Sequence, residues 1–174
     1  MTSLATKPGA DEAAPYYFTY IDKVPPGDIR ETLARQKDET LEFLLGIPED
    51  ATRRRPEPGK WTLREVLAHV NDTERLFVFR AFWFARGFDS PLPSFEPDIA
   101  AAAGAGDDVT WARHVEEFTA VRSATIAFFR NLPEAAWNRT GIASGNPFTV
   151  RSFAWLAAGH LEHHLRIVRE RYLA

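Results

Sequence analysis

The chain has 174 residues, of which 45% are hydrophobic and 26% charged, and it contains no cysteine. This composition is typical of one folded domain, and it excludes a disulfide framework, thiolate metal ligands and a catalytic cysteine. The formal net charge of −3 argues against a general nucleic-acid-binding protein, which needs a basic face. No apolar run reaches the length of about 18 residues that a membrane span needs, and no signal peptide is visible. We therefore expect a cytoplasmic protein without nucleic-acid or membrane partners.

The N-terminal residues 1–15 are small, polar and interrupted by proline, and we expect a flexible tail there. We expect residues 16–174 to form one domain. Its first residues, from Tyr16 to Tyr20, are largely aromatic and are expected to pack back onto the body of the protein.

Four segments have the apolar spacing of long helices. They cover about residues 28–45, 62–86, 109–131 and 149–172. Thr62 and Glu65 form a capping-box pattern at the start of the second segment, and Asp28 can cap the first. No strand alternation competes, and residues 87–98 and 133–148 are expected to be loops. The sequence therefore predicts an all-α protein with an up-down four-helix bundle.

The second half of the second helix is apolar on nearly every side, with Arg80 as the exception. Such a helix is central in the bundle or also meets a second subunit. Arg80 and Arg122 both interrupt apolar faces. Each could hold an anionic substrate group or form a buried pair with an acid. The run Arg53–Arg55 beside prolines is read as a solvated loop, with an anion or partner contact as the alternative.

Histidine is the residue type that points most clearly to chemistry. His160 and His164 are four residues apart, so both project from one face of the last helix and could bind one metal ion. His69 lies among apolar positions of the second helix and needs a polar partner. One ion bound by His69, His160 and His164 meets that need, whereas the alternative is a set of hydrogen-bonded core histidines. His163 could replace either member of the pair, and His114 is expected on the surface.

Several known metal sites are excluded by spacing. Leu161 follows His160, which rules out the zinc-protease pattern HExxH, and the inverted pattern HxxEH fails because position 163 is histidine. A di-iron bundle needs paired Glu-x-x-His motifs, but Ala68 lies three residues after Glu65 and Leu165 three after Glu162. A mononuclear site fits the sequence better.

Two separated segments resemble signatures of the DinB-like superfamily, also described as DinB/YfiT-like metalloenzymes. They read PGKWTLREVLAHVNDTER at residues 58–75 and GHLEHHLRIVRERY at residues 159–172. Residues 80–87 and 118–122 between them are also similar, and the likeness spans roughly residues 16–173. The resemblance implies an up-down four-helix bundle that is often a homodimer. It also implies a divalent metal, commonly nickel or zinc, on His69, His160 and His164, with His163 as a neighbour.

The family includes thiol S-transferases and isomerases that use low-molecular-weight thiols. The resemblance therefore implies a metal-dependent enzyme for a small-molecule substrate, with such a thiol as a possible cosubstrate. A metal-dependent hydrolase and a non-enzymatic helical dimer remain alternatives. As catalytic candidates, Asp72 could orient an imidazole, Glu162 could act as a base and Arg80 could bind an anionic group.

Overall fold

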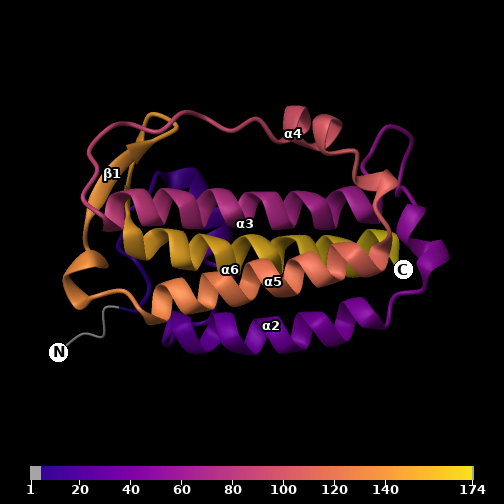
Figure 1. The fold of residues 1–174 in the computed structure, drawn as a ribbon, viewed down its shortest axis with the longest axis horizontal. Coiled ribbons are helices and arrows are strands. Elements are labelled where there is room, and N and C mark those ends of the chain that lie inside the picture. The colour runs from indigo at the N-terminus through magenta and orange to yellow at the C-terminus, as the bar shows by residue number, and fades with distance from the viewer. Residues whose placement is uncertain (1–4, 174) are drawn as a thin grey trace.

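Four long helices lie side by side in the computed structural model, which describes residues 5–173 (Figure 1). They are α2 (Ile29–Leu45), α3 (Leu63–Ala85), α5 (Trp111–Arg130) and α6 (Val150–Ile167). Helix α3 packs against α5 and α6, and α2 packs against the same two helices from the other side. The predicted all-α four-helix bundle is confirmed. No helix among the described residues combines the length and the apolar character that crossing a membrane requires.

The helix starts follow from local side-chain chemistry. Thr62 and Glu65 form the predicted capping box, in which the Thr62 hydroxyl accepts from the Glu65 N–H and the Glu65 carboxylate accepts from the Thr62 N–H. Asp28 caps α2 by accepting from the Arg30 N–H, and Thr149 caps α6 by accepting from the Ser152 N–H. The last predicted helix ends earlier than expected, because a π-helical turn, Val168–Tyr172, follows α6.

The direction of the helices differs from simple alternation. Gly106, just before α5, lies against Glu65 at the start of α3, and Asn71 of α3 donates to the carbonyl of His114 of α5. Helices α3 and α5 therefore run in the same direction, and the order is up, down, down, up. The connection between them returns along the whole length of the bundle (Figure 1). It carries α4 (Pro97–Gly104) and a short 3-10 turn, Gly106–Asp108.

A β-hairpin occupies part of the segment that was expected to be a loop. Strands β1 (Thr140–Ala143) and β2 (Asn146–Thr149) pair antiparallel, so the expectation that residues 133–148 contain no strand was wrong. Ser144 and Gly145 connect them with φ angles of 51° and 71°, which gives the tight turn that matches strand twist. Leu92 of the long connection donates to Ile142 at 2.9 Å and accepts from Ser144 at 3.1 Å, so the connection is attached to the hairpin.

The N-terminal segment packs against the bundle from residue 5 onward, whereas the sequence predicts a flexible tail over residues 1–15. The Ala5 carbonyl accepts from the Ile29 N–H at 3.1 Å, and the Ala13 side chain is buried. The Glu12 carboxylate accepts from the Thr149 hydroxyl at 2.8 Å and forms an ion pair with Arg151. Residues 1–4 lie outside the described residues. The segment leads into a 3-10 turn, Pro15–Tyr17, and α1 (Phe18–Ile21), which packs on α6 as expected for the aromatic cluster.

The buried apolar side chains form two clusters, one toward each end of the bundle. One contains Phe77, Phe153 and Trp155, and the other contains Trp111 and Leu161. Polar side chains are buried between them, at the middle of every long helix. They are Gln36 of α2, His69 and Glu74 of α3, Arg122 of α5, and His160 of α6. This set is called the polar layer below.

Gly159 allows α1 to lie directly on α6. A Cβ atom at this position would lie 2.2 Å from the carbonyl oxygen of Tyr20 and 2.5 Å from its carbonyl carbon. Both atoms belong to the backbone, so α1 would have to move.

We therefore expect Gly159→Ala to lower the free energy of unfolding by about 1–3 kcal/mol, although alanine is the better helix former by about 1 kcal/mol. Gly104→Ala in α4 is the matched control, since nothing lies within 4 Å of its added Cβ. Urea unfolding of both variants measures the difference. A Gly159→Ala protein as stable as the parent would contradict the close packing of α1 on α6.

Candidate metal centre

Three histidines from two helices lie close together. His69 and His160 belong to the polar layer, and His164 lies one turn further along α6. His69 projects from α3, and His160 and His164 project from successive turns of the antiparallel helix α6. The Nε2 atom of His160 lies 3.1 Å from Nε2 of His69 and 3.1 Å from Nε2 of His164. One ring nitrogen of each histidine lies within 4.8 Å of the other two. The structure thus brings together the three histidines that the spacing selected.

This donor set fits a single transition-metal ion. Imidazole nitrogens bind zinc at about 2.0–2.1 Å, so two of them on one tetrahedral ion lie about 3.3 Å apart. The observed separations of 3.1 Å are close to that value. Imidazole nitrogen suits zinc, nickel, copper and iron, whereas magnesium and calcium prefer oxygen ligands. The three residues therefore match the type of site that the sequence suggested.

The protonation of the histidines also suits a metal. Burial lowers the pKa of His69 to about 4, against a small opposing effect of the Asp98 charge. Burial and the neighbouring imidazoles lower the pKa of His164 to about 3, and they hold the pKa of His160 well below its ordinary value. All three rings are therefore neutral at pH 7, which is the form that binds a metal.

Aromatic rings surround the three histidines. Trp61 lies 5.0 Å from His69 between ring centres, Tyr20 lies 5.4 Å from His160, and Phe77 lies 5.9 Å from His160. On the far side of the His69 ring, Nδ1 lies 3.4 Å from the Thr73 hydroxyl. These contacts fix the ring planes and reduce the access of water.

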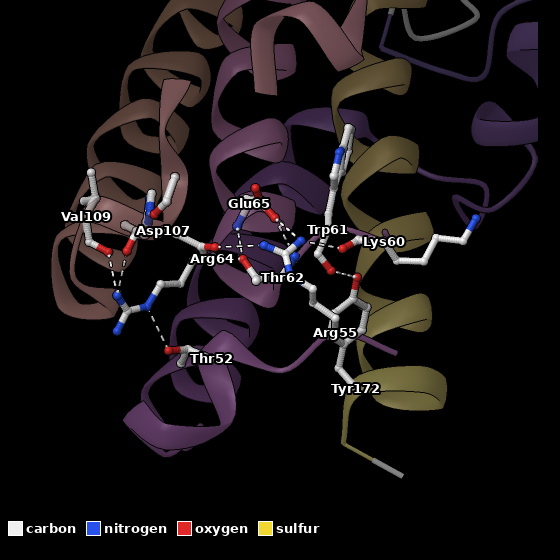
Figure 2. A network of polar contacts seen from close by, with 12 residues as sticks. Thr52, Arg55, Lys60, Trp61, Thr62, Arg64, Glu65, Asp107, Val109 and Tyr172 are labelled. Carbon is white, nitrogen blue, oxygen red and sulfur yellow. Dashed lines mark hydrogen bonds and ion pairs between the residues drawn. The ribbon is translucent and has the colours of Figure 1, made fainter. Parts of the chain in front are cut away.

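Trp61 is held in place by a network of polar contacts at the start of α3 (Figure 2). The Tyr172 hydroxyl donates to the Trp61 carbonyl at 2.8 Å, and Arg55 donates to the Lys60 carbonyl next to it. Arg55 also pairs with Glu65 and with Asp107, each at 3.0 Å. The third arginine of the Arg53–Arg55 run is therefore engaged within the protein. The network joins the C-terminal turn, the segment before α3 and the segment before α5.

A cavity of about 410 Å³ opens beside the histidines. Its walls come from α3 and α6, from the tyrosines around α1, and from Phe95, Pro97 and Asp98 of the long connection. Arg80 of α3 and Ser144 of the hairpin turn also line it. This volume is within the range of small-molecule binding sites, about 300–1,000 Å³. The candidate metal centre thus lies at the wall of a substrate-sized cavity.

Comparison with known proteins identifies the family and the fold of the chain. A family model described as the DinB superfamily matches residues 32–168. The chain belongs to the DinB superfamily. The solved structure of YfiT from Bacillus subtilis matches with a TM-score of 0.68 and 15% sequence identity, covering 96% of this chain and 94% of that one. That protein is described as "a probable metal-dependent hydrolase with an unusual four-helix bundle topology". The likeness shows a shared fold. No curated protein sequence matches the chain.

The three catalytic candidates of this DinB-superfamily chain, Asp72, Glu162 and Arg80, lie in different parts of the structure. Asp72 contacts Arg75 at 3.4 Å, and the residue at the His69 ring is its neighbour Thr73. Glu162 accepts from the Gln36 side chain at 2.8 Å. Arg80 lines the cavity together with His163.

His114 was predicted to lie on the surface, but the structure shows it buried. Only 2% of the residue is exposed, and Nε2 donates to the Gly106 carbonyl at 2.8 Å. The chain packs the turn before α5 against this ring, so the histidine has a structural partner that no spacing rule reveals. Trp61, Tyr20 and Thr73 were also missed as site residues. The only signals for them were an aromatic residue before the capping box and the tyrosine cluster.

The rest of the polar layer is an ion pair with one supporting amide. Arg122, with 0% exposure, donates from Nε and Nη2 to one oxygen of Glu74 at 3.1 and 2.7 Å. Its Nη1 donates to the Gln36 side-chain oxygen at 3.1 Å, and the Gln36 amide nitrogen donates to Glu162 and to the Ala158 carbonyl. Of the two possibilities raised for Arg122, the structure shows the buried pair with an acid.

We expect Glu74→Gln to destabilise the protein by about 3–5 kcal/mol, because it leaves Arg122 buried without its counter-charge. The double variant Glu74→Leu/Arg122→Met should regain most of that loss, since it removes both charges. Glu39→Gln is the control, because Glu39 pairs with Arg35 on the surface of α2 and should change stability by less than about 0.5 kcal/mol. Urea unfolding measures all three. A single variant no less stable than the control would contradict a coupled buried pair.

Proposed function

We propose that the chain is a metal-dependent enzyme that binds one divalent transition metal through His69, His160 and His164 and acts on a small molecule. The observation that carries this proposal is the group of three neutral imidazoles, with Nε2 separations of 3.1 Å, at the wall of a cavity of about 410 Å³. A closed structural site would use four protein ligands, whereas three leave a position open for substrate. Zinc and nickel are the metals we favour, since the family resemblance implies them and both accept imidazole nitrogen.

A divalent metal with an open position acts as a Lewis acid and lowers the pKa of a water or thiol that binds it. The residues of the chain supply the surroundings. The rings of Trp61, Tyr20 and Phe77 hold apolar parts of a substrate and restrict water. Thr73 lies at the outer nitrogen of His69 and keeps that ring oriented. The roles of Asp72 in orienting an imidazole and of Glu162 as a base stay predictions.

Hydrolysis of an ester or amide is the reaction we favour. The description of YfiT as a metal-dependent hydrolase supports it, together with the shared fold. Transfer of a low-molecular-weight thiol is the second candidate. The chain has no cysteine, so any thiol in the reaction must come from a cosubstrate.

We further propose that the protein works as a cytoplasmic homodimer. Phe79 and Phe82 on the outer side of α3, and Phe88 just after it, are exposed by 47%, 38% and 47%. Apolar side chains gathered in this way are typical of a subunit contact. A subunit contact would also explain why the second half of α3 is apolar on nearly every side.

Metal content tests the proposal directly. After reconstitution with zinc or nickel, the parent protein should hold about one equivalent, and His160→Ala should hold none, because the central ligand is lost. His163→Ala is the matched control, since it removes a neighbouring imidazole of α6 that lies outside the three-histidine group. Elemental analysis of untagged protein measures the metal. A parent protein that holds no metal would favour the non-enzymatic helical module.

With metal present, a panel of esters, amides and thiol acceptors separates the two reactions. Hydrolysis without added thiol supports the first candidate, and turnover only with an added low-molecular-weight thiol supports the second. In either case the turnover should disappear in His160→Ala.

A further inference from the structure

Arg80 and His69 face the same cavity from opposite ends of one helix face. They are eleven residues apart on α3, which is three helical turns, so their side chains project from the same side with Cα atoms about 16 Å apart. Thr73 and Phe77 lie between them on that face and also line the cavity. A molecule that fills the cavity therefore extends from the histidines toward Arg80.

The Arg80 side chain differs from the other buried arginines. Arg122 pairs with Glu74, and Arg64 pairs with Glu49. Arg80 is only 2% exposed, yet no carboxylate among the described residues lies within ion-pair distance of its side chain. A buried charge without a partner is unfavourable by several kcal/mol. The charge of Arg80 is therefore uncompensated by the residues around it.

Two neutral groups use part of the Arg80 guanidinium. Nη2 donates to the Pro93 carbonyl at 2.8 Å and to the Ser144 hydroxyl at 3.0 Å. The Nε atom is buried and has no hydrogen-bond partner in the described part of the chain. Burial lowers the pKa of Arg80, with Tyr17 beside it as the only opposing influence. The side chain thus keeps its charge beside the cavity, and one of its guanidinium donors lacks a partner among the described residues.

The charged side chains along the cavity are few. Among the described residues that line it, Arg80 is the one lysine or arginine, and the one carboxylate, Asp98, lies near His69. An anionic group on a ligand is therefore favoured at Arg80. The aromatic side chains between the two ends suit an apolar linker.

We propose that Arg80 is a binding site for the anionic oxygen group, such as a carboxylate or phosphate, of a substrate whose reacting group lies at the histidines. The assignment of the reacting end rests on the function proposed above, whereas the anion site rests on Arg80 itself. Arg80 also joins the long connection to the hairpin through Nη2, and a purely structural role of this kind is the competing explanation.

Short-chain probes test the anion site without any metal. Metal-free protein is titrated by calorimetry with hexanoate, hexyl phosphate and hexan-1-ol, which share an apolar chain. We expect the parent protein to bind at least one of the two anions about tenfold or more tightly than the alcohol. Arg80→Gln should lose this preference, and Arg80→Lys should keep part of it. Arg139→Gln is the matched control, because Arg139 also donates to a backbone carbonyl, that of Ala85, but lies outside the cavity.

A second measurement needs no substitution and so does not depend on the folding of a variant. The Nε–H proton of Arg80 gives an NMR signal that should shift when an anionic probe is added to the parent protein, but not with hexan-1-ol. Equal binding of anions and alcohol, together with an unmoved Arg80 signal, would overturn the proposal and leave Arg80 as a structural link. Retention of the preference in a folded Arg80→Gln protein would overturn it as well.

Cobalt-loaded protein then tests whether both ends act together. 6-Mercaptohexanoate should bind more tightly than 6-mercaptohexanol, and both should change the visible absorption of cobalt through their thiols. The two proposals fail differently. Protein that takes up no metal but binds hexanoate through Arg80 overturns the proposed function alone. Protein that binds cobalt and both thiols with equal affinity overturns the anion site alone.

Discussion

The buried pair of Arg122 and Glu74 sets the register of the bundle. It lies between two apolar clusters, at a level where apolar side chains alone would allow neighbouring helices to slide. A charged pair with 0% and 4% side-chain exposure does not allow this, because any shift leaves a charge without its partner. Gln36 extends the pair from α2 to Glu162 of α6, which lies between His160 and His164 in the sequence. The position of the histidines on α6 is therefore fixed by interactions on the side of the helix that faces away from the cavity.

The long connection between α3 and α5 forms one wall of the cavity beside the three histidines. Because α3 and α5 run in the same direction, the chain must return along the bundle before α5 begins, and it does so alongside α3 (Figure 1). The return places Phe95 and Asp98 on the wall of the cavity. The hairpin holds the start of this connection, through the backbone bonds of Leu92, and Arg80 holds it through Pro93. An alternating bundle with short loops would lack this wall of the cavity.

Local patterns predicted the parts of this structure that depend on local chemistry. The capping box at Thr62 and the four-residue spacing of His160 and His164 are properties of single helices, and both helices form as expected. The meeting of His69 with that pair required one further idea, that a buried imidazole needs a partner. The parallel direction of α3 and α5 could not be predicted in this way, because no residue within a helix encodes its direction relative to a helix far along the chain. The packing of residues 5–15 was missed since small side chains such as Ala5 give no periodic signal.

The two ends of the cavity show how one helix face can serve two kinds of chemistry. Burial has opposite consequences for histidine and arginine at pH 7: it removes the proton from His69, whereas Arg80 keeps its charge because its ordinary pKa is far above neutrality. The same apolar groove therefore produces neutral donors at one end and an unpaired cation at the other. At one end, imidazole nitrogens 3.1 Å apart can share a proton or bind one metal ion, and at the other end the buried Nε of Arg80 has no hydrogen-bond partner in the described part of the chain. A metal ion on the imidazoles and an anionic group on Arg80, as proposed, would occupy both ends, and the distance along α3 between them would set the length of the molecule that bridges them.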